Sequence, residues 1–163
     1  MNWQDGIAYA HSVAKGEINV CRDVRLACQR FINQYENKEW EYVFDPDYPQ
    51  HILEFAAALK HTKGVFAGQP VVLEPFQIFF LCAVYGFRFK KDHTRRMVTD
   101  VILFIPRKAG KSTLTAVIGL YELICGEPGA EVFTLATNRE QAMASRCRCH
   151  HQECAVRPGT AVC

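Results

Sequence analysis

A short basic turn that ends in Gly110-Lys111-Ser112 carries the residue types of a phosphate-binding loop. The pattern G-x-x-x-x-G-K-[ST] binds phosphates because backbone N–H groups and a helix N-terminus point at the anion. Lys111 would place a charge on the β- and γ-phosphates, the Ser112 hydroxyl would bind Mg²⁺, and Thr113 would follow as a nucleotide-binding residue. The first glycine of the pattern is replaced by Ile105, so the tripeptide alone is weak evidence.

The residues on either side of this turn predict a strand–loop–helix arrangement. Residues 101–105 are all apolar, which is typical of a parallel strand that is covered on both faces. A helix is expected to begin near Lys111 and to end before Gly126, with residues 131–136 as the next strand. The loop would then lie at the first turn of a βαβ unit, and a basic surface turn is the alternative. The apolar face of the helix is predicted to be Leu114, Val117, Ile118, Tyr121, Leu123 and Ile124.

The composition is that of an ordinary globular protein. The chain has 163 residues, 49% of them hydrophobic and 22% charged, with a net charge of +2. It contains no apolar run long enough to span a bilayer, and it starts without the features of a signal peptide. We therefore expect a cytoplasmic location and no membrane partner. Cys21, Cys28, Cys82 and Cys125 stand singly in apolar or helical stretches and are expected to be small buried hydrophobic residues.

The first 70 residues are expected to be helical. Predicted helices cover residues 6–14, 19–36 and about 47–59, and a loop follows at residues 61–70. Glu74 and Pro75 suit the start of another helix. Its buried residues are predicted to be Phe76, Phe79, Phe80, Ala83 and Val84.

Gln77 is a polar residue in the otherwise apolar first turn of that helix. It is interpreted either as a partly exposed helix residue or as a reader of adenine, because its amide has the donor and the acceptor that the N6/N7 edge of adenine requires. A basic connection then follows, which is expected to be a solvated hairpin or loop and which in a DNA-handling protein would contact phosphates. Its basic residues are Lys90, Lys91, His93, Arg95 and Arg96.

Several motifs together resemble the N-terminal ATPase part of tailed-phage terminase large subunits, the motors that pump DNA into proheads. The resemblance covers about residues 2–142, and it rests on the set of motifs because none is specific alone. The motifs are Val24–Arg30, His61–Gly64, Ala67–Pro70, Leu73–Gln77, Pro106–Ser112 and Ala136–Ala142.

The resemblance implies a role for each residue of the loop. Phosphate loops of this family commonly have a basic, non-glycine form, which Arg107 and Lys108 match. By resemblance Lys111 is the phosphate lysine, Ser112 the Mg²⁺ ligand, Gln77 the adenine-reading glutamine, and Arg107 an additional cation. ATP and Mg²⁺ are the implied cofactors. Double-stranded phage DNA, the small terminase subunit and the portal are the implied partners. A solvated turn is the alternative for Arg107 and Lys108.

The sequence departs from the family after Ala142. An ATPase of this kind needs a second strand that ends in Asp-Glu, and the only acids beyond position 137 are Glu140 and Glu153. The family's coupling motif and nuclease domain are not found either. We expect this chain to bind ATP and to lack hydrolysis and nuclease activity. Residues 143–163 lack any periodicity and are expected to be disordered; they are interpreted as an out-of-frame tail, or as a zinc site at Cys147, Cys149, His150, His151 and Cys154.

These observations predict an α/β protein in which an N-terminal helical segment is followed by an incomplete parallel sheet of the P-loop NTPase type. The expected divisions are residues 1–70 (helical), 71–142 (partial ATPase domain) and 143–163 (tail). By the same resemblance Thr137 to Gln141 would be the family's segment that responds to nucleotide or DNA, and a plain helix N-terminus capped by Thr137 or Asn138 is the alternative. Two further functions stay open: another P-loop ATP-binding protein such as a helicase, and a non-enzymatic DNA- or partner-binding module with a zinc tail.

Overall fold

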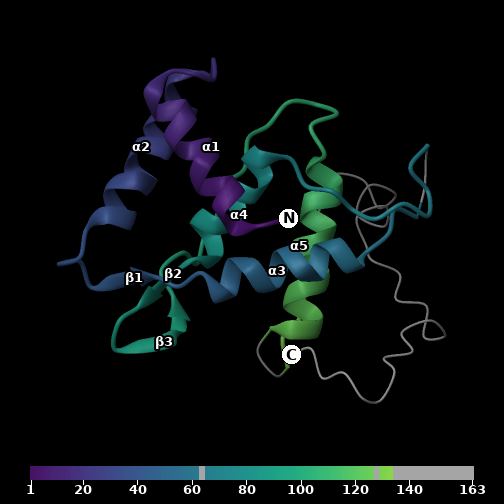
Figure 1. Ribbon diagram of the computed structural model, residues 1–163. Coiled ribbons are helices and arrows are strands. Elements are labelled where there is room, and N and C mark those ends of the chain that lie inside the picture. The colour runs from purple at the N-terminus through teal and green to yellow at the C-terminus, as the bar shows by residue number, and fades with distance from the viewer. Residues whose placement is uncertain (63–64, 127–128, 134–163) are drawn as a thin grey trace. The chain divides into compact units, whose positions relative to one another are not determined.

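The computed structural model describes residues 1–62, 65–126 and 129–133, which fall into two compact units. The first unit runs from Met1 to Phe104, and the second begins at Ile105. In the described residues the first unit has the helices α1 to α4 and the strands β1 to β3, and the second has the helix α5 (Figure 1). None of the helices in these residues is both long and apolar enough to cross a bilayer.

Helix α1 (Trp3–Lys15) has signals at both ends that fix its length. The Asn2 side chain accepts a hydrogen bond from the Gln4 backbone N–H at 3.1 Å, and the Asp5 carboxylate accepts one from the Asn2 N–H at 3.1 Å. Gly16 ends the helix with a φ of 81°, a conformation that glycine adopts without a steric penalty. The predicted helix at residues 6–14 is therefore confirmed, and it is longer than predicted.

Helix α1 packs directly against the backbone of helix α4 (Pro75–Tyr85) at Gly6. A Cβ atom on Gly6 would lie 2.8 Å from the Phe79 backbone nitrogen and 2.9 Å from the Ile78 carbonyl carbon. Only a residue without a side chain fits at this distance. The two helices therefore approach each other more closely than larger side chains at Gly6 would permit.

Helix α4 begins at Pro75 as predicted, but the prediction of its buried face was wrong. Phe76, Phe79, Phe80, Ala83 and Val84 are only partly buried. The helix is apolar on nearly every side, so the pattern did not distinguish one face from another. The contact with α1 at Gly6 determines instead which face of α4 is buried. Its buried residues are Gln77, Ile78, Leu81, Cys82 and Tyr85.

An aromatic cluster centred on Phe31 joins four elements of the first unit. Phe31 lies on helix α2 (Arg22–Glu36), and its ring centroid is 5.4 Å from that of Phe79 on α4. The centroids of Phe44, on strand β1 (Tyr42–Phe44), and Phe87, on strand β2 (Phe87–Phe89), are 5.9 and 5.3 Å away. Helix α3 (Asp47–Ala58) follows β1 and contributes Ile52, Leu53 and Ala56 to the buried core. The helices predicted at 19–36 and 47–59 are thus confirmed.

The sheet is antiparallel, with the strand order β1-β2-β3. Strand β3 (Asp92–Arg96) pairs with β2, so the basic connection is a hairpin whose two-residue turn is Lys90-Lys91. The fold is mixed α and β, as expected, but the predicted parallel sheet was wrong. In the described residues neither 101–105 nor 131–133 forms a strand, and residues 134–136 lie outside them. The side chains of Ile102 and Phe104 are 98% and 99% exposed. None of the described segments pairs with residues 101–105 or covers them.

Helix α5 (Lys111–Cys125) begins at the predicted residue. Leu114, Val117 and Tyr121 are buried, as the helical spacing predicted. Leu123 and Ile124 were also predicted on this face, but each is about half exposed. Leu123 lies two residues after Tyr121 and so points to the opposite side of the helix, whereas Ile124 has the i+3 spacing of the buried side but lies in the last turn, next to the end of the helix at Cys125.

The single cysteines have different environments. Cys28 and Cys82 are buried as expected, and burial raises the thiol pKa to about 11 for Cys28 and about 12 for Cys82. Both are therefore thiols, not thiolates, at neutral pH. Cys21 is exposed at the start of α2 and Cys125 is partly exposed, so the expectation of burial was wrong for Cys21. Cys21 is exposed because it is the residue just before the first turn of α2.

We predict that Gly6→Ala destabilises the protein, although alanine favours helix formation by about 0.5–1 kcal/mol over glycine. The new methyl group would collide with the α4 backbone, and overpacking of this kind costs about 1–3 kcal/mol. Urea unfolding at equilibrium measures the net change. The exposed Ala8 on the same helix gives the matched control, because Ala8→Gly should lose only the propensity difference. A more stable Gly6→Ala variant would contradict the close packing of α1 on α4.

Candidate nucleotide-binding loop

The predicted phosphate loop is a turn at residues 107–110 that leads directly into α5. Two of its residues have left-handed backbone conformations: Lys108 with a φ of 68° and Gly110 with a φ of 73°. Lys108 is the one non-glycine residue with positive φ among the described residues. Such a conformation costs roughly 1 kcal/mol or more for a residue with a side chain, and it is enriched at functional sites. Alternation of left-handed with ordinary residues turns successive N–H groups toward a common side, which creates a concave anion site.

The first turn of α5 presents backbone N–H groups without a side-chain cap. Gly110 is the cap residue, and no side-chain capping hydrogen bond is made there. The first turn contains no acidic residue that would neutralise the positive end of the helix dipole. The peptide dipoles of its 15 residues add along the helix axis and leave a partial positive charge at this end. Lys111 and Ser112 are exposed and Thr113 is partly exposed at this turn. These are the physical requirements for binding a phosphate group at a helix N-terminus.

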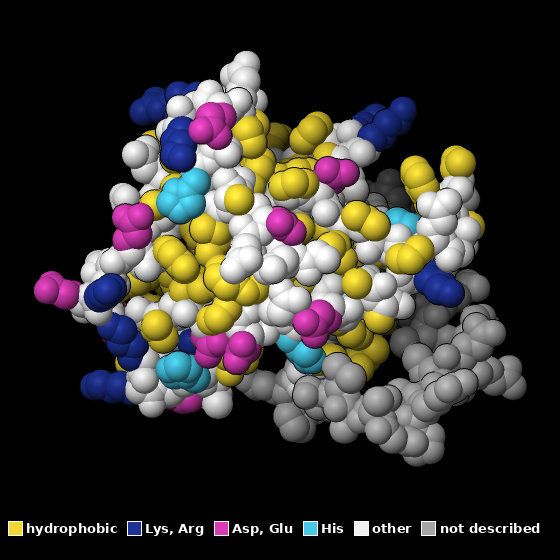
Figure 2. Space-filling model, viewed as in Figure 1, with side chains coloured by type: hydrophobic (Ala, Val, Ile, Leu, Met, Phe, Trp, Pro, Cys, Tyr) yellow, Lys and Arg dark blue, Asp and Glu magenta, His cyan; other side chains and the backbone are white. Residues whose placement is uncertain are grey.

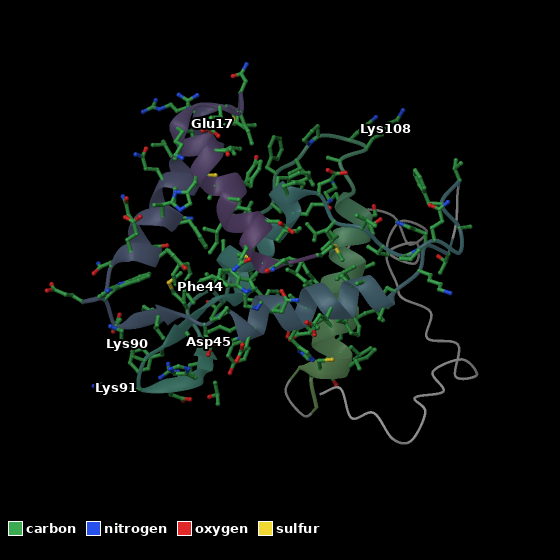
Figure 3. The ribbon with its side chains drawn as sticks, in the orientation of Figure 1. Glu17, Phe44, Asp45, Lys90, Lys91 and Lys108 are labelled. Carbon is green, nitrogen blue, oxygen red and sulfur yellow. The ribbon has the colours of Figure 1, made fainter. Side chains whose placement is uncertain are left out.

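The side chains of the loop add positive charge that is not ion-paired with any acid of the described residues. Arg107, Lys108 and Lys111 are all exposed. Across the residues that the structure describes, the one ion pair is between His93 and Asp45, in the other unit. Figure 3 shows the Lys108 side chain extending outward from the chain just before α5. The loop therefore combines three cations with the uncapped end of a helix.

Ser112 presents a hydroxyl group in the first turn of α5. A hydroxyl oxygen is a ligand that Mg²⁺ accepts, and this ion commonly takes its other ligands from phosphate oxygens and water. Thr115 does not compete for that role, because its hydroxyl donates to the Lys111 carbonyl oxygen at 2.9 Å. The residues of the loop therefore fit a magnesium–nucleotide complex. Among the described residues there is no cluster of three or more His, Cys, Asp or Glu side chains that would bind a metal by itself.

Gln77 has a structural role that the sequence interpretation did not include. Its side chain is 4% exposed, so the alternative of a partly exposed helix residue was wrong. The Oε1 atom accepts a hydrogen bond from the Glu74 backbone N–H at 2.9 Å, which ties the side chain to the start of α4. The spacing Glu74-x-x-Gln77 is that of a capping box, and this signal in the sequence would have revealed the contact. Gln77 and the loop lie in different units, and the adenine-reading role stays a prediction.

Some predicted sites fall outside the described residues. These are the segment Thr137 to Gln141, Glu140, and the cysteines and histidines of the tail at 147–154. The first unit also has an open groove of about 510 Å³, which is lined by residues of α2 from Leu26 onward, by Asn37 and by Trp40. None of the predicted nucleotide-binding residues lines this groove.

Comparison with known families gives one match, to the family model described as terminase large subunit, ATPase domain, over residues 75–145. Comparisons with curated proteins and with solved structures gave no match. The matched segment starts at the first residue of α4 and includes the hairpin, the basic loop and all of α5. It therefore contains every residue for which a nucleotide-binding role was predicted. Residues 75–145 of this chain are therefore similar to the ATPase domain of terminase large subunits, the family that the motifs of the sequence implied.

Proposed function

We propose that this chain is the ATP-binding part of a DNA-packaging motor and that it binds Mg-ATP through residues 107–113. The observation that carries the proposal is the uncapped N-terminus of α5, which follows a basic turn with two left-handed residues. The family match supports ATP as the nucleotide and double-stranded phage DNA as the cargo. By the same resemblance the small terminase subunit and the portal are its partners in a bacterial host.

Each residue of the loop has a definite role in this proposal. The N–H groups at the start of α5 bind phosphate oxygens, and Lys111 adds its charge to the β- and γ-phosphates. Ser112 supplies one oxygen ligand to Mg²⁺, and Thr113 supplies a further N–H group in the first helical turn. Arg107 and Lys108 balance the remaining charge of the triphosphate. Gly110 provides the left-handed turn that aims the N–H groups at the ligand.

We predict that Lys111→Ala removes most of the binding of Mg-ATP, because the positive charge at the phosphates is lost. Isothermal titration of the purified chain with Mg-ATP measures the change, which is expected to be at least tenfold in Kd. Lys15→Ala is the matched control, since it removes an exposed lysine at the end of α1. Equal heats for the wild type and the Lys111→Ala variant would show that the loop is not the nucleotide site.

We predict that Gln77→Glu lowers the preference for ATP over GTP. Glutamate at this position still accepts the hydrogen bond from Glu74 N–H, since either residue serves in a capping box. It lacks the amide N–H that would donate to N7 of adenine, and a paired contact of this type is worth about 1–3 kcal/mol of discrimination. Competition titrations with ATP and GTP measure the ratio of the two affinities. An unchanged ratio in the variant would limit Gln77 to its capping role.

We also propose that the chain binds ATP without hydrolysing it and without cutting DNA. Phosphoryl transfer needs an acid to hold Mg²⁺ and another group to orient the attacking water, and neither was identified in the sequence. Phosphate release by the purified chain, with and without linear DNA, is expected to stay well below the turnover of about 1 s⁻¹ at the low end for enzymes. Turnover above this level that is lost in Lys111→Ala would overturn this part of the proposal.

A further inference from the structure

The hairpin of β2 and β3 carries its basic residues on an exposed edge of the first unit. Lys90 and Lys91 form its two-residue turn, and all five residues of β3 are exposed. Figure 3 shows Lys90 and Lys91 at the turn, on the side away from Asp45. Strand β3 is the last strand of the sheet order β1-β2-β3. Its outer edge has no neighbouring strand among the described residues.

Three cations of the hairpin, Lys90, Lys91 and Arg95, have no ion-pair partner among the described residues. Lys90 Nζ donates to the Lys38 backbone carbonyl oxygen at 2.6 Å, which is an uncharged acceptor. The Arg95 guanidinium lies over the Phe89 ring, 5.7 Å from its centroid, and Lys91 is exposed at the turn. No carboxylate of the described residues forms an ion pair with any of these three side chains, since the His93–Asp45 pair is the one found there.

Two acids of the hairpin and its anchor, Asp92 and Asp45, accept hydrogen bonds from groups of the chain itself, and hydrogen bonds from Thr94 together with the charge of Arg95 lower the pKa of the Asp92 carboxyl. Figure 2 shows acidic as well as basic side chains at the corner of the molecule where Figure 1 draws the hairpin. Asp92 accepts hydrogen bonds from the Thr94 hydroxyl at 2.6 Å and from the Thr94 N–H at 3.1 Å. Asp45 is 3.1 Å from His93 Nδ1 and also accepts from the Asp47 N–H at 3.2 Å. These contacts orient both carboxylates within the chain.

Arg88 and Tyr48 fix the outer strand in place. Arg88 is 5% exposed, and it donates from Nε to the Tyr85 carbonyl oxygen at 3.2 Å and from Nη1 to the Thr94 carbonyl oxygen at 3.3 Å. Its guanidinium lies 3.4 Å from the centroid of the Tyr48 ring. The Tyr48 hydroxyl donates to the His93 carbonyl oxygen at 3.0 Å. The hairpin is therefore anchored to α3 and to the end of α4, which positions its cations.

We propose that the turn and outer strand of this hairpin bind the phosphate backbone of double-stranded DNA through Lys90, Lys91 and Arg95. Neighbouring strands lie about 5 Å apart, so a two-stranded ribbon fits within the DNA major groove, which is about 12 Å wide. Lysine and arginine contacts to phosphate hold a protein on the duplex without reading its sequence. A membrane surface is a poorer fit, because neither the turn nor β3 has an apolar side chain to insert. This site lies in the first unit, apart in the chain from the nucleotide loop.

The test is the binding of a fluorescent DNA duplex of mixed sequence to the full chain, measured by anisotropy over a series of salt concentrations. The variant Lys90→Gln/Lys91→Gln removes two charges and keeps polar side chains at the turn. Lys90→Arg/Lys91→Arg keeps the charges. Arg22→Gln/Arg25→Gln is the matched control, since it removes two exposed cations from α2 and lowers the net charge by the same amount. Circular dichroism checks that each variant is folded.

We expect the glutamine variant of the hairpin to bind DNA at least tenfold more weakly in low salt. The slope of log K against log salt should become shallower by about 1–2, because each phosphate contact contributes about 0.9. The arginine variant and the α2 control should retain the affinity and slope of the wild type. Equal losses in the hairpin and α2 variants would indicate a general effect of net charge and would overturn the proposal. Wild-type binding by a folded glutamine variant, or binding of anionic lipid vesicles in place of DNA, would overturn it as well.

Discussion

The contacts of Phe31 with aromatic rings on β1, α4 and β2 are the interaction on which the first unit depends. Its ring lies against Phe44, Phe79 and Phe87, with centroids 5.3–5.9 Å apart and steep angles between the ring planes. Edge-to-face pairs of this kind are worth about 0.5–1.5 kcal/mol beyond the area that they bury. Through them one residue of α2 fixes β1, α4 and the start of β2 together. The position of the basic hairpin follows, because β2 leads directly into its turn.

The close approach of α1 and α4 is the second constraint, and it explains why the sequence predicted the helices but not the face of α4. Helix ends were predictable from local signals, such as Gly16 after α1 and Pro75 at the start of α4. The buried face of α4 was not, since its apolar residues surround the helix and only the contact at Gly6 selects one side. Strand β1 was missed for a similar reason. It has three residues, and its partner in the sheet lies more than forty residues further along the chain.

At the candidate site, too, features set by neighbouring residues were predictable from the sequence, and features set by contacts distant in the chain were not. The start of α5 at Lys111 and the basic character of the loop were both predictable from the sequence. The left-handed conformation of Lys108 was not, because no residue type at that position signals it. The parallel sheet was predicted from the apolar run at 101–105. Val101, Ile102 and Phe104 of that run are exposed, because a strand requires a neighbouring strand and the described residues provide none. An apolar run indicates that a segment can be buried in a sheet, but it does not show which other segment pairs with it.

The central claim is that the backbone N–H groups at the start of α5 bind the phosphates of ATP. Hydrogen exchange of the backbone amides, measured residue by residue with and without Mg-ATP, tests this claim most directly. The account predicts slower exchange at residues 108–113 when the nucleotide is present, and unchanged exchange in the β2–β3 hairpin. Nucleotide-dependent protection confined to residues 1–104, with none at the loop, would contradict it.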